Sequence, residues 1–323
     1  MARTQTVADV HRPVLGQAGA PSRRSRLTFG RVLPYLAIAP ALITFVLLLG
    51  YPVVLVIETS LQHMGLRELI NGGTTWVGLR NFQAILADPE FVATVVRTFV
   101  FMATNVVLTI VLGTLVALLL DRLGRRIRLV LSGAMILAWA TPALTGSVIF
   151  QWLFDSKLGV VNWAIGSVGI FGSWLNHSWF STGFSTFAII TLLIVWQGIP
   201  FVAFSLYAGV LAIPGELPEA ARADGANERQ IFRFVTLPAI RPLLMVLTFL
   251  SIIWDFKVFT QVWTMAQGGP DGATVTLSIF AYITGLSRSQ FGIAAAVSVV
   301  MVMLLLLVLI PYIQRMLRAQ EDL

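Results

Sequence analysis

Few residues of this 323-residue chain are suited to covalent or metal chemistry. The chain has no cysteine, which excludes disulfides, thiolate zinc sites and cysteine nucleophiles. Its three histidines, His11, His63 and His177, lie far apart in sequence, so a histidine-rich metal site is not expected. Gly146-Ser147 is the nearest approach to a serine nucleophile elbow, but no histidine lies in an apolar segment to serve as its base. The sequence therefore predicts no catalytic residue, no bound cofactor and no metal.

A nucleotide phosphate loop is also missing. Such a loop needs a Gly-Lys pair within a glycine-rich turn. The two lysines, Lys157 and Lys257, follow Ser156 and Phe256 instead. We therefore expect that this chain does not itself hydrolyse ATP.

Three ionisable residues, Arg97, Asp255 and Lys257, lie within long apolar segments. Charges inside a membrane are costly and are functional candidates by default. Asp255 and Lys257 are two positions apart, so on a helix they project to different sides and are poor partners for each other. Asp255 either lines a pathway or pairs structurally with a cation such as Arg97, whereas the long stem of Lys257 can reach the membrane surface.

The elements that must position these residues follow from composition. Hydrophobic residues make up 57% of the chain and charged residues 11%, and the mean hydropathy is +0.84. A soluble domain has about 25% charged residues, because polar side chains must cover its surface. The composition is therefore that of a chain surrounded by lipid.

Six apolar segments are long enough to cross a membrane. About 20 residues of helix span a hydrocarbon core of about 30 Å, and the backbone in lipid must satisfy its own hydrogen bonds. The fold class predicted is an all-α integral membrane protein with about six transmembrane helices. The first segment is too long for a signal-peptide core and is expected to be retained. The expected spans are residues 33–58, 93–120, 127–152, 184–212, 239–263 and 291–314.

Lysine and arginine are distributed unevenly between alternate connections. Sixteen of the 22 precede the first span, follow the last span, or lie after the second and fourth spans, while the alternate connections hold four. Cytoplasmic segments carry such an excess, so both termini are expected in the cytoplasm and the basic charge does not indicate nucleic-acid binding. Residues 1–31 are expected to form a flexible cytoplasmic tail, with a binding arm as the alternative, and residues 32–323 the transmembrane domain.

The connection at residues 213–242 is more organised than a plain loop. Pro218 suits the first turn of a helix, and Glu219 is favourable at the positive end of the helix dipole. Two alanines then favour helix without adding bulk, and Gly225 permits a sharp turn. These residues predict a short helix whose small face suits either the cleft of another protein or the membrane surface.

A second helix is expected after that turn. Asn227 can cap it, and Gln230 three residues later completes a capping box. Phe232 belongs to its apolar side. Pro238 is expected to end this helix and to leave Leu237 extended.

The residues of this connection follow the spacing of a known family. They are Glu219, Ala220, Ala221, Asp224, Gly225, Ala226, Phe232, Leu237, Pro238 and Pro242. They resemble the EAA loop, which marks the membrane subunits of binding-protein-dependent ABC importers.

Further stretches are similar to the carbohydrate-uptake branch of that family. They are residues 77–82 (VGLRNF) and 267–270 (QGGP), and the first span also fits through residues 39–41 and 51–52. The resemblance covers about residues 30–320 and points to maltose-type permeases that pair with a second, different permease. The arginine-rich tail lies outside it.

The resemblance implies a type I importer permease of the bacterial inner membrane. Its partners would be a second permease subunit, two cytoplasmic ATPase subunits that bind the ATP, and an extracytoplasmic solute-binding protein. The EAA loop would form the coupling helix that docks on an ATPase, with Glu219 paired to a basic group and Gly225 allowing the turn. The coupling residues carried over are Glu219, Ala220, Ala221, Asp224 and Gly225.

The resemblance also implies a sugar-lining surface on the fourth and fifth spans. Carboxylates, amides and aromatic faces hold sugars by hydrogen bonds to hydroxyls and by stacking on ring C–H faces. The relatives have an amide at the position of Asp255, which leaves room for a different solute, and Trp254 and Phe201 could equally pack against helices or lipid. The matching positions are Gln197, Gly198, Phe201, Ser251, Trp254 and Asp255.

Two other classes of function are weighed. A secondary transporter driven by an ion gradient would also have charges within its spans, but it does not need a loop with the EAA spacing. A membrane-embedded hydrolase needs a nucleophile with a base, or a metal set, and the sequence supplies neither. The function predicted is therefore the non-catalytic subunit that forms the pathway of an ATP-driven importer for a mono- or oligosaccharide or a sugar derivative.

Overall fold

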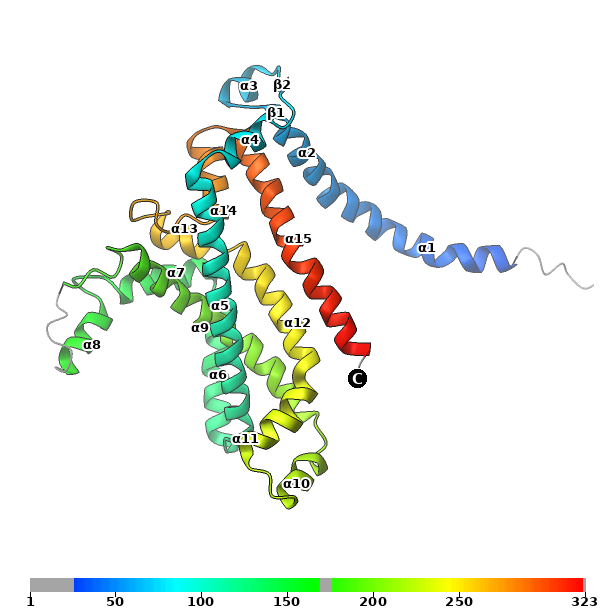
Figure 1. Cartoon of the computed structure of the whole chain (residues 1–323), viewed down its shortest axis with the longest axis vertical. Helices are drawn as coiled ribbons and strands as arrows, with labels where there is room; N and C mark the ends of the chain where they lie inside the picture. Colours follow the sequence, from blue (N-terminus) through cyan, green and yellow to red (C-terminus); the bar gives the residue numbers. More distant parts are fainter. Residues whose placement is uncertain (1–25, 169–175, 322–323) are drawn as a thin grey trace, which may run out of the picture. The chain divides into compact units, whose positions relative to one another are not determined.

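The computed structural model describes residues 26–168 and 176–321, and helices predominate among them (Figure 1). The chain divides into two compact units, residues 1–54 and 55–323. Five of the described helices are long and apolar enough to cross a membrane, and a bent pair makes up to six crossings. The predicted all-α membrane fold is confirmed.

The first unit is built on one helix that continues into the second unit. Its described elements are α1 (Arg26–Phe45), the π turn η1 (Val46–Gly50) and the first residues of α2 (Tyr51–Ser60), which crosses into the second unit after residue 54. At η1 the N–H of Tyr51 donates to the carbonyl of Val46, directly before Pro52. The wider turn accommodates the proline without ending the helix. The expected tail lies outside the described residues up to residue 25 and stays a prediction there, whereas Arg26 already belongs to α1.

The body of the second unit consists of long helices joined by shorter ones (Figure 1). The long helices are α5 (Pro89–Arg122), α9 (Gly183–Leu211), α12 (Leu237–Phe256) and α15 (Phe291–Glu321). The shorter helices are α6 (Arg125–Ala140), α7 (Ala143–Leu153), α8 (Val160–Val168), α10 (Glu216–Ala223), α11 (Glu228–Ile231), α13 (Thr260–Ala266) and α14 (Leu277–Tyr282). Two π turns, η2 (Phe232–Thr236) and η3 (Ile283–Ser287), complete the set.

A small cap, residues 61–88, lies at the end of the second unit opposite α10 (Figure 1). Its elements are the antiparallel strands β1 (Gln62–His63) and β2 (Thr75–Trp76) and the helices α3 (Leu66–Asn71) and α4 (Arg80–Leu86). The buried amide of Asn81 donates to the carbonyls of Ser60 and Gln62, at 2.9 Å each. The 77–82 motif thus anchors the cap to α2 and β1.

Helices α5 and α9 form the most extensive helix pair of the second unit. A Cβ added to Gly113 would lie 2.6 Å from Cγ1 of Val202, and one added to Gly198 would lie 2.9 Å from Cγ2 of Thr109. Small residues let helix backbones approach closely in membranes, where packing drives association. The two glycines therefore set the spacing of α5 and α9.

Helix α12 packs against both α5 and α15. The rings of Phe99 and Phe256 lie 5.5 Å apart between α5 and α12. The hydroxyl of Tyr312 on α15 donates to the carbonyl of Met245 on α12, at 2.9 Å. These contacts place α12 at the centre of the second unit.

The third expected span, residues 127–152, is not one straight helix. Helices α6 and α7 meet at an angle of 105° around Thr141 and Pro142. Pro142 has no N–H to continue α6, and it pushes Thr141 into an extended conformation (φ −69°, ψ 120°). The prediction of a continuous span is wrong for this reason.

Pro238 does not end the helix that starts at Glu228, so that prediction is also wrong. Helices α11 and α12, with η2 between them, form one span of 29 residues from Glu228 to Phe256. At η2 the N–H of Leu237 donates to the carbonyl of Phe232, and Leu237 is helical (φ −62°, ψ −43°). The wider π turn makes room for the proline ring, as it does before Pro52.

The fifth span differs from residues 239–263 at its other end as well. Helix α12 stops at Phe256 with Lys257 as its C-cap, and a separate helix begins at Thr260. The 267–270 motif then follows α13 and contains a cis peptide bond before its proline. The helix that carries Asp255 thus ends one residue after it.

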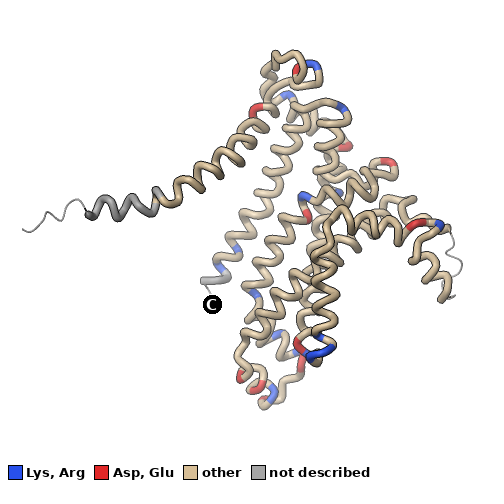
Figure 2. The backbone as a smooth tube through the Cα atoms, turned by 180° about the vertical axis from the view of Figure 1, so that it is seen from behind, with Lys and Arg blue, Asp and Glu red and all other residues tan. Residues whose placement is uncertain are grey.

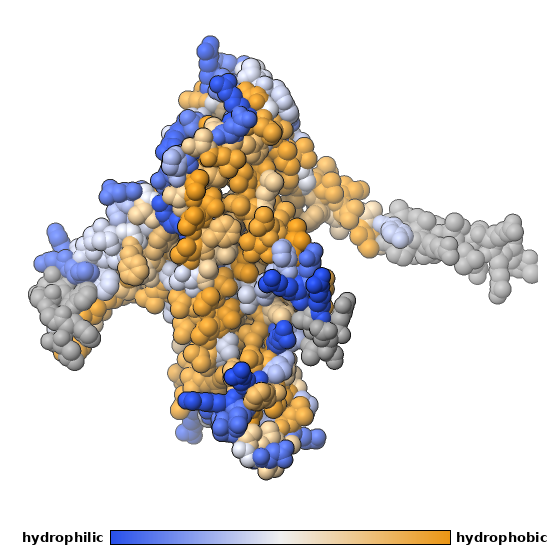
Figure 3. Space-filling model, viewed as in Figure 1, coloured by the Kyte–Doolittle hydropathy of each residue, from blue (hydrophilic) through white to orange (hydrophobic). Residues whose placement is uncertain are grey.

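Charge and hydropathy divide the second unit along its helices. Lys, Arg, Asp and Glu gather mainly at the cap end and at the α10 end (Figure 2), and the surface between them is mostly hydrophobic (Figure 3). At the α10 end, Arg128 donates to the carbonyls of Leu120 and Leu123, at 2.8 Å each, and so satisfies the end of α5. This distribution suits helices that cross a lipid bilayer.

Replacing Gly113 with alanine is expected to destabilise the protein. The new Cβ would clash with Val202, and overpacking a close contact costs about 1–3 kcal/mol. Thermal unfolding of the detergent-solubilised protein measures the effect. The matched control is Gly133→Ala on α6, where the added Cβ meets no atom within 4 Å. Equal unfolding midpoints for the two variants would contradict the close α5–α9 contact.

Candidate functional site

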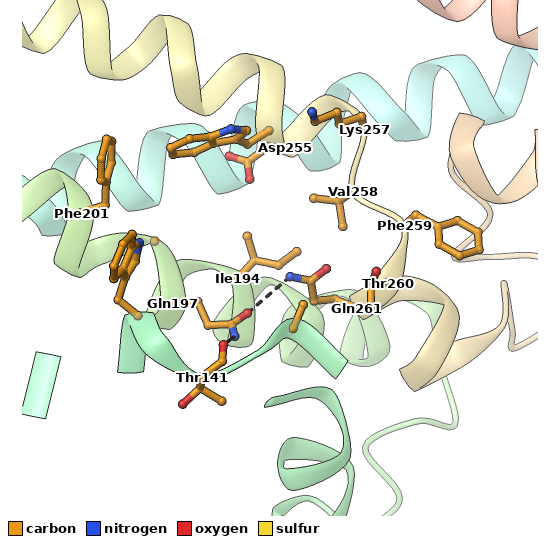
Figure 4. A pocket seen from close by; sticks show the side chains of 14 residues that line it. Thr141, Ile194, Gln197, Phe201, Asp255, Lys257, Val258, Phe259, Thr260 and Gln261 are labelled. Carbon is orange, nitrogen blue, oxygen red and sulfur yellow. Dashed lines mark hydrogen bonds between the residues drawn. The ribbon is translucent and has the colours of Figure 1, made fainter. Parts of the chain in front are cut away.

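A cavity of about 440 Å³ lies where two helix interruptions of the second unit come together (Figure 4). One is the bend between α6 and α7 at Thr141, and the other is the junction of α12 and α13 after Lys257. Helix α9 completes the wall with Gln197 and Phe201. Helix ends leave backbone groups without intrahelical partners, so polar side chains are needed at this place in an otherwise apolar body.

Most of the residues predicted for the pathway line this cavity. They are Gln197, Gly198, Phe201, Trp254 and Asp255. Ser251 is not among the lining residues; it lies one helical turn before Asp255 and is 5% exposed. The structure therefore brings together five of the six positions, and their contact with a solute stays a prediction.

Several residues that line the cavity were not predicted from the sequence, among them Trp139 and Gln261, and Lys257 had been given no role in the site. Gln261 is a polar residue in an apolar stretch, and Trp139 comes shortly before Pro142, so both carried a weak signal. Only the bend and the junction bring them to the same cavity.

Asp255 is the buried acid of the site. It is 8% exposed, and within residues 26–168 and 176–321 its carboxylate has no hydrogen bond or ion pair. Arg97 is not its partner, because its guanidinium donates to the carbonyl of Val275 at 2.8 Å and pairs with Glu90 at 3.3 Å. The structural pair that the sequence left open is thus absent, and the Asp255 carboxylate can accept hydrogen bonds from a solute.

Lys257 brings a positive charge to the same cavity (Figure 4). Its side chain is exposed, and no ion pair joins it to Asp255 in the described part of the chain. A carboxylate and an ammonium group therefore line one cavity without neutralising each other through direct contact.

Gln197 holds the interrupted helices together. Its Nε2 donates to the carbonyl of Thr141 at 2.9 Å, and its Oε1 accepts from Nε2 of Gln261 at 3.4 Å (Figure 4). A second glutamine, Gln151 on α7, donates to the carbonyl of Thr264 in the last turn of α13, at 3.0 Å. These amides satisfy carbonyl groups that the interruptions leave without helical partners.

Two aromatic rings close one side of the cavity. Phe201 on α9 and Trp254 on α12 meet edge to face, with centroids 5.2 Å apart and an interplanar angle of 65°. Trp254 remains 45% exposed, so part of its face is open to a bound molecule. The site thus combines a carboxylate, amides and aromatic faces.

A larger groove of about 930 Å³ runs between α5 and α9. Its lining is mainly apolar, from Val96 and Val100 on α5 to Phe184 and Phe187 on α9, with Arg97 among the few polar residues. An apolar groove suits hydrocarbon or another helix better than a hydroxylated solute. The smaller, polar cavity is therefore the better candidate for a solute site.

The α10 segment, residues 213–227, lies at the opposite end of the second unit from the cap (Figure 1). Helix α10 is followed by Gly225 with φ +85°, and the N–H of Ala226 donates to the carbonyl of Ala221 at 2.9 Å. The side chain of Asn227 accepts from the N–H of Gln230 at 3.0 Å, and the Gln230 side chain accepts from the N–H of Asn227 at 2.8 Å. The predicted helix, glycine turn and capping box are all confirmed.

The predicted coupling residues lie together on this segment. Glu219, Ala220, Asp224 and Gly225 are exposed, and Ala221 is half-buried. The structure thus presents a small-faced helix at the surface with room for a partner's cleft.

The sequence also matches a known family model over both the cavity helices and the α10 segment. The model, described as the binding-protein-dependent transport system inner membrane component, matches residues 109–320, which is more than half of the chain. The chain belongs to this family. It is therefore a multi-pass membrane component of such a transport system.

Two permease proteins of named sugar transport systems are similar in sequence to this chain. The chain is similar to the diacetylchitobiose uptake system permease protein of Streptomyces coelicolor, with 42% identity over 98% of this chain and 96% of that protein. It is also similar to the trehalose/maltose transport system permease protein of Thermococcus litoralis, with 32% identity over 74% of this chain and 79% of that protein.

A solved structure has the same fold as this chain. It is a chain of a bacterial ABC transporter involved in the import of the acidic polysaccharide alginate, with a TM-score of 0.77 and 19% identity. The alignment covers 92% of this chain and 99% of that chain.

Replacing Gln197 with leucine is expected to destabilise the protein at the wall of the cavity. The Thr141 carbonyl would lose a part-buried hydrogen bond, and such a bond contributes about 0.5–1.5 kcal/mol to stability. Thermal unfolding in detergent measures the loss. The control Gln261→Leu removes only the longer bond of 3.4 Å and is expected to shift the midpoint less. A larger shift for Gln261→Leu would contradict the anchoring role of Gln197.

Proposed function

We propose that this chain is the permease subunit that forms the translocation pathway of an ATP-driven sugar importer. The observation that carries the proposal is the cavity between α6–α7, α9 and α12–α13, which combines a buried unpaired carboxylate with amides and aromatic rings inside a membrane-spanning body. Hydroxyl-rich solutes are held by such groups, through hydrogen bonds to oxygen and stacking on ring C–H faces. Family membership supplies the transport context.

The solute class that the relatives support is a short oligosaccharide. The 42% identical relative is named for diacetylchitobiose uptake and the 32% identical one for trehalose and maltose. A disaccharide of N-acetylated amino sugars is therefore the first solute to test. The Asp255 carboxylate can accept hydrogen bonds from its hydroxyl or acetamido N–H groups.

The chain works with partners that supply energy and solute. We infer a second permease subunit, two cytoplasmic ATPase subunits and an extracytoplasmic solute-binding protein, with ATP bound by the ATPases and no cofactor or catalytic centre in this chain. The exposed face of α10, with Glu219 beside its alanines, is the surface that docks on an ATPase. Gly225 lets the chain turn back after the docking helix, because its φ of +85° is strained for other residues.

The orientation follows from charge. The excess of lysine and arginine in the tail, in residues 121–128 and 213–241 and after the last span supports a cytoplasmic location for α10 and for both termini. The cap then faces outward, where a binding protein delivers solute. The predicted cytoplasmic tail is proposed only for the residues before α1, which begins at Arg26, and the transmembrane domain follows it.

A transporter driven by an ion gradient is the alternative. It would use the cavity charges without needing the α10 segment. Copurification from mildly solubilised native membranes, together with ATP-dependent uptake by proteoliposomes, separates the two. An ATPase and a second permease that copurify with the tagged chain support the importer. A chain that transports alone in response to a gradient refutes it.

Replacing Gly225 with valine is expected to weaken coupling to the ATPase. A β-branched residue at φ +85° is strained by about 1–2 kcal/mol, which displaces the turn after the docking helix. Copurified ATPase and solute uptake should both fall, while membrane insertion is retained. The control is Gly215→Ala, where φ is −58° and an added Cβ meets no atom within 4 Å. Normal uptake by Gly225→Val would count against the docking role.

Replacing Asp255 with asparagine is expected to alter solute recognition and leave ATPase binding intact. The neutral amide removes a charged acceptor from the cavity, and a hydrogen bond to a charged group is worth about 1.5–3 kcal/mol. The apparent KM for uptake should therefore rise by roughly tenfold or more. Asp271→Asn, in the exposed loop after α13, is the control. Unchanged uptake kinetics for Asp255→Asn would remove it from the site.

A further inference from the structure

Glu228 joins the ends of three helices at the α10 end of the second unit. Its Oε2 accepts from Arg122, the last residue of α5, at 2.9 Å. Its Oε1 accepts from Nε of Arg222, in the last turn of α10, at 3.2 Å. Glu228 itself is the first residue of α11. One carboxylate therefore bridges two arginines on different helices.

This bridge is the side-chain attachment of α10 within the described residues. No other side chain of residues 216–223 makes a hydrogen bond or ion pair in that part of the structure. The backbone links α10 to the body on both sides: the connection from Leu211, the end of α9, precedes it, and the turn through Gly225, with the bond from Ala226 to Ala221, follows it. The Glu228 bridge adds a side-chain route to these two backbone routes.

Both helices that Glu228 holds lead to the cavity. The helical span that begins at Glu228 runs to Phe256 and carries Trp254 and Asp255 near its far end. Helix α5 touches α9 where Thr109 meets Gly198, and Gly198 lines the cavity. The bridge therefore connects the α10 segment to the cavity in two ways, through the continuous span from Glu228 to Phe256 and through the packing of α5 against α9.

We propose that Glu228 is a positioning residue that transmits movement of the ATPase-docked α10 to α5 and α12. The proposal rests on the coupling role of α10 proposed above. The three side chains are more than half exposed, at 65% for Arg122, 55% for Glu228 and 53% for Arg222, so the bridge adds little to stability. The bridge instead acts mechanically, because it makes α10 move together with α5 and α12. Screening by salt weakens the bridge.

The experiment uses the complete transporter in proteoliposomes, with Glu228→Gln and the matched control Asp121→Asn. Asp121 is an exposed acid in the last turn of α5, outside α10, and its side chain has no hydrogen bond or ion pair among the described residues. The readout is solute imported per ATP hydrolysed, at low and high ionic strength. Glu228→Gln is expected to lower this ratio roughly two- to fivefold at low salt, the size of one exposed ion pair, with the ATPase still bound. High salt should lower the import ratio of the natural protein toward that of the variant and leave the ratio of the variant unchanged.

Arg122→Gln is the second variant, because Arg122 lies outside the docking segment. It should lower the ratio to a similar degree, and the double variant Arg122→Gln/Glu228→Gln should be no worse than either single change. If both single variants import as much solute per ATP hydrolysed as the natural protein, the proposal is overturned. Loss of the ATPase from the Glu228→Gln complex also overturns it, since Glu228 would then belong to the docking surface. A chain that never associates with an ATPase refutes the coupling role itself, which distinguishes the two failures.

Discussion

The satisfaction of backbone hydrogen bonds away from water is the constraint on which this structure depends. A carbonyl left unpaired in lipid costs several kcal/mol, so each interruption of a helix must be answered by a nearby donor. Gln197 donates to the Thr141 carbonyl at the bend, and Gln151 donates to the Thr264 carbonyl at the end of α13. The prolines at 52 and 238 are absorbed differently, by π turns that keep the helices continuous.

The same constraint explains where the cavity lies. Polar side chains are tolerated inside the body only where interrupted helices need them, and two interruptions meet beside α9. Gln197, which donates to the Thr141 carbonyl at the bend, thereby brings an amide to the cavity that Asp255 and the Phe201–Trp254 pair also line. A cavity built in this way is already partly organised, because Gln197 is held by bonds within the protein.

Continuity of helix links this site to the surface segment at α10. Had Pro238 ended the helix, the α10 segment and the cavity would be joined by a flexible connection. Instead the span from Glu228 to Phe256 is unbroken, and the bridge from Glu228 to Arg122 ties it to α5. Rigid elements with few attachments transmit a displacement with little loss, whereas flexible loops absorb it. The mechanism proposed for the importer depends on this difference.

Much of the protein could be predicted from sequence, because the relevant interactions are local. Apolar length gave the membrane helices, the Asn227–Gln230 spacing gave the capping box, and Gly225 gave the left-handed turn. The effect of a proline on its helix could not be predicted from the sequence. Helices α6 and α7 meet at 105° before and after Pro142, whereas a π turn before Pro238 keeps its helix continuous. The gathering of Trp139, Gln197, Asp255 and Gln261 around one cavity was likewise beyond the sequence. Those residues come from segments far apart in the chain, and only the packing of interrupted helices against α9 brings them together.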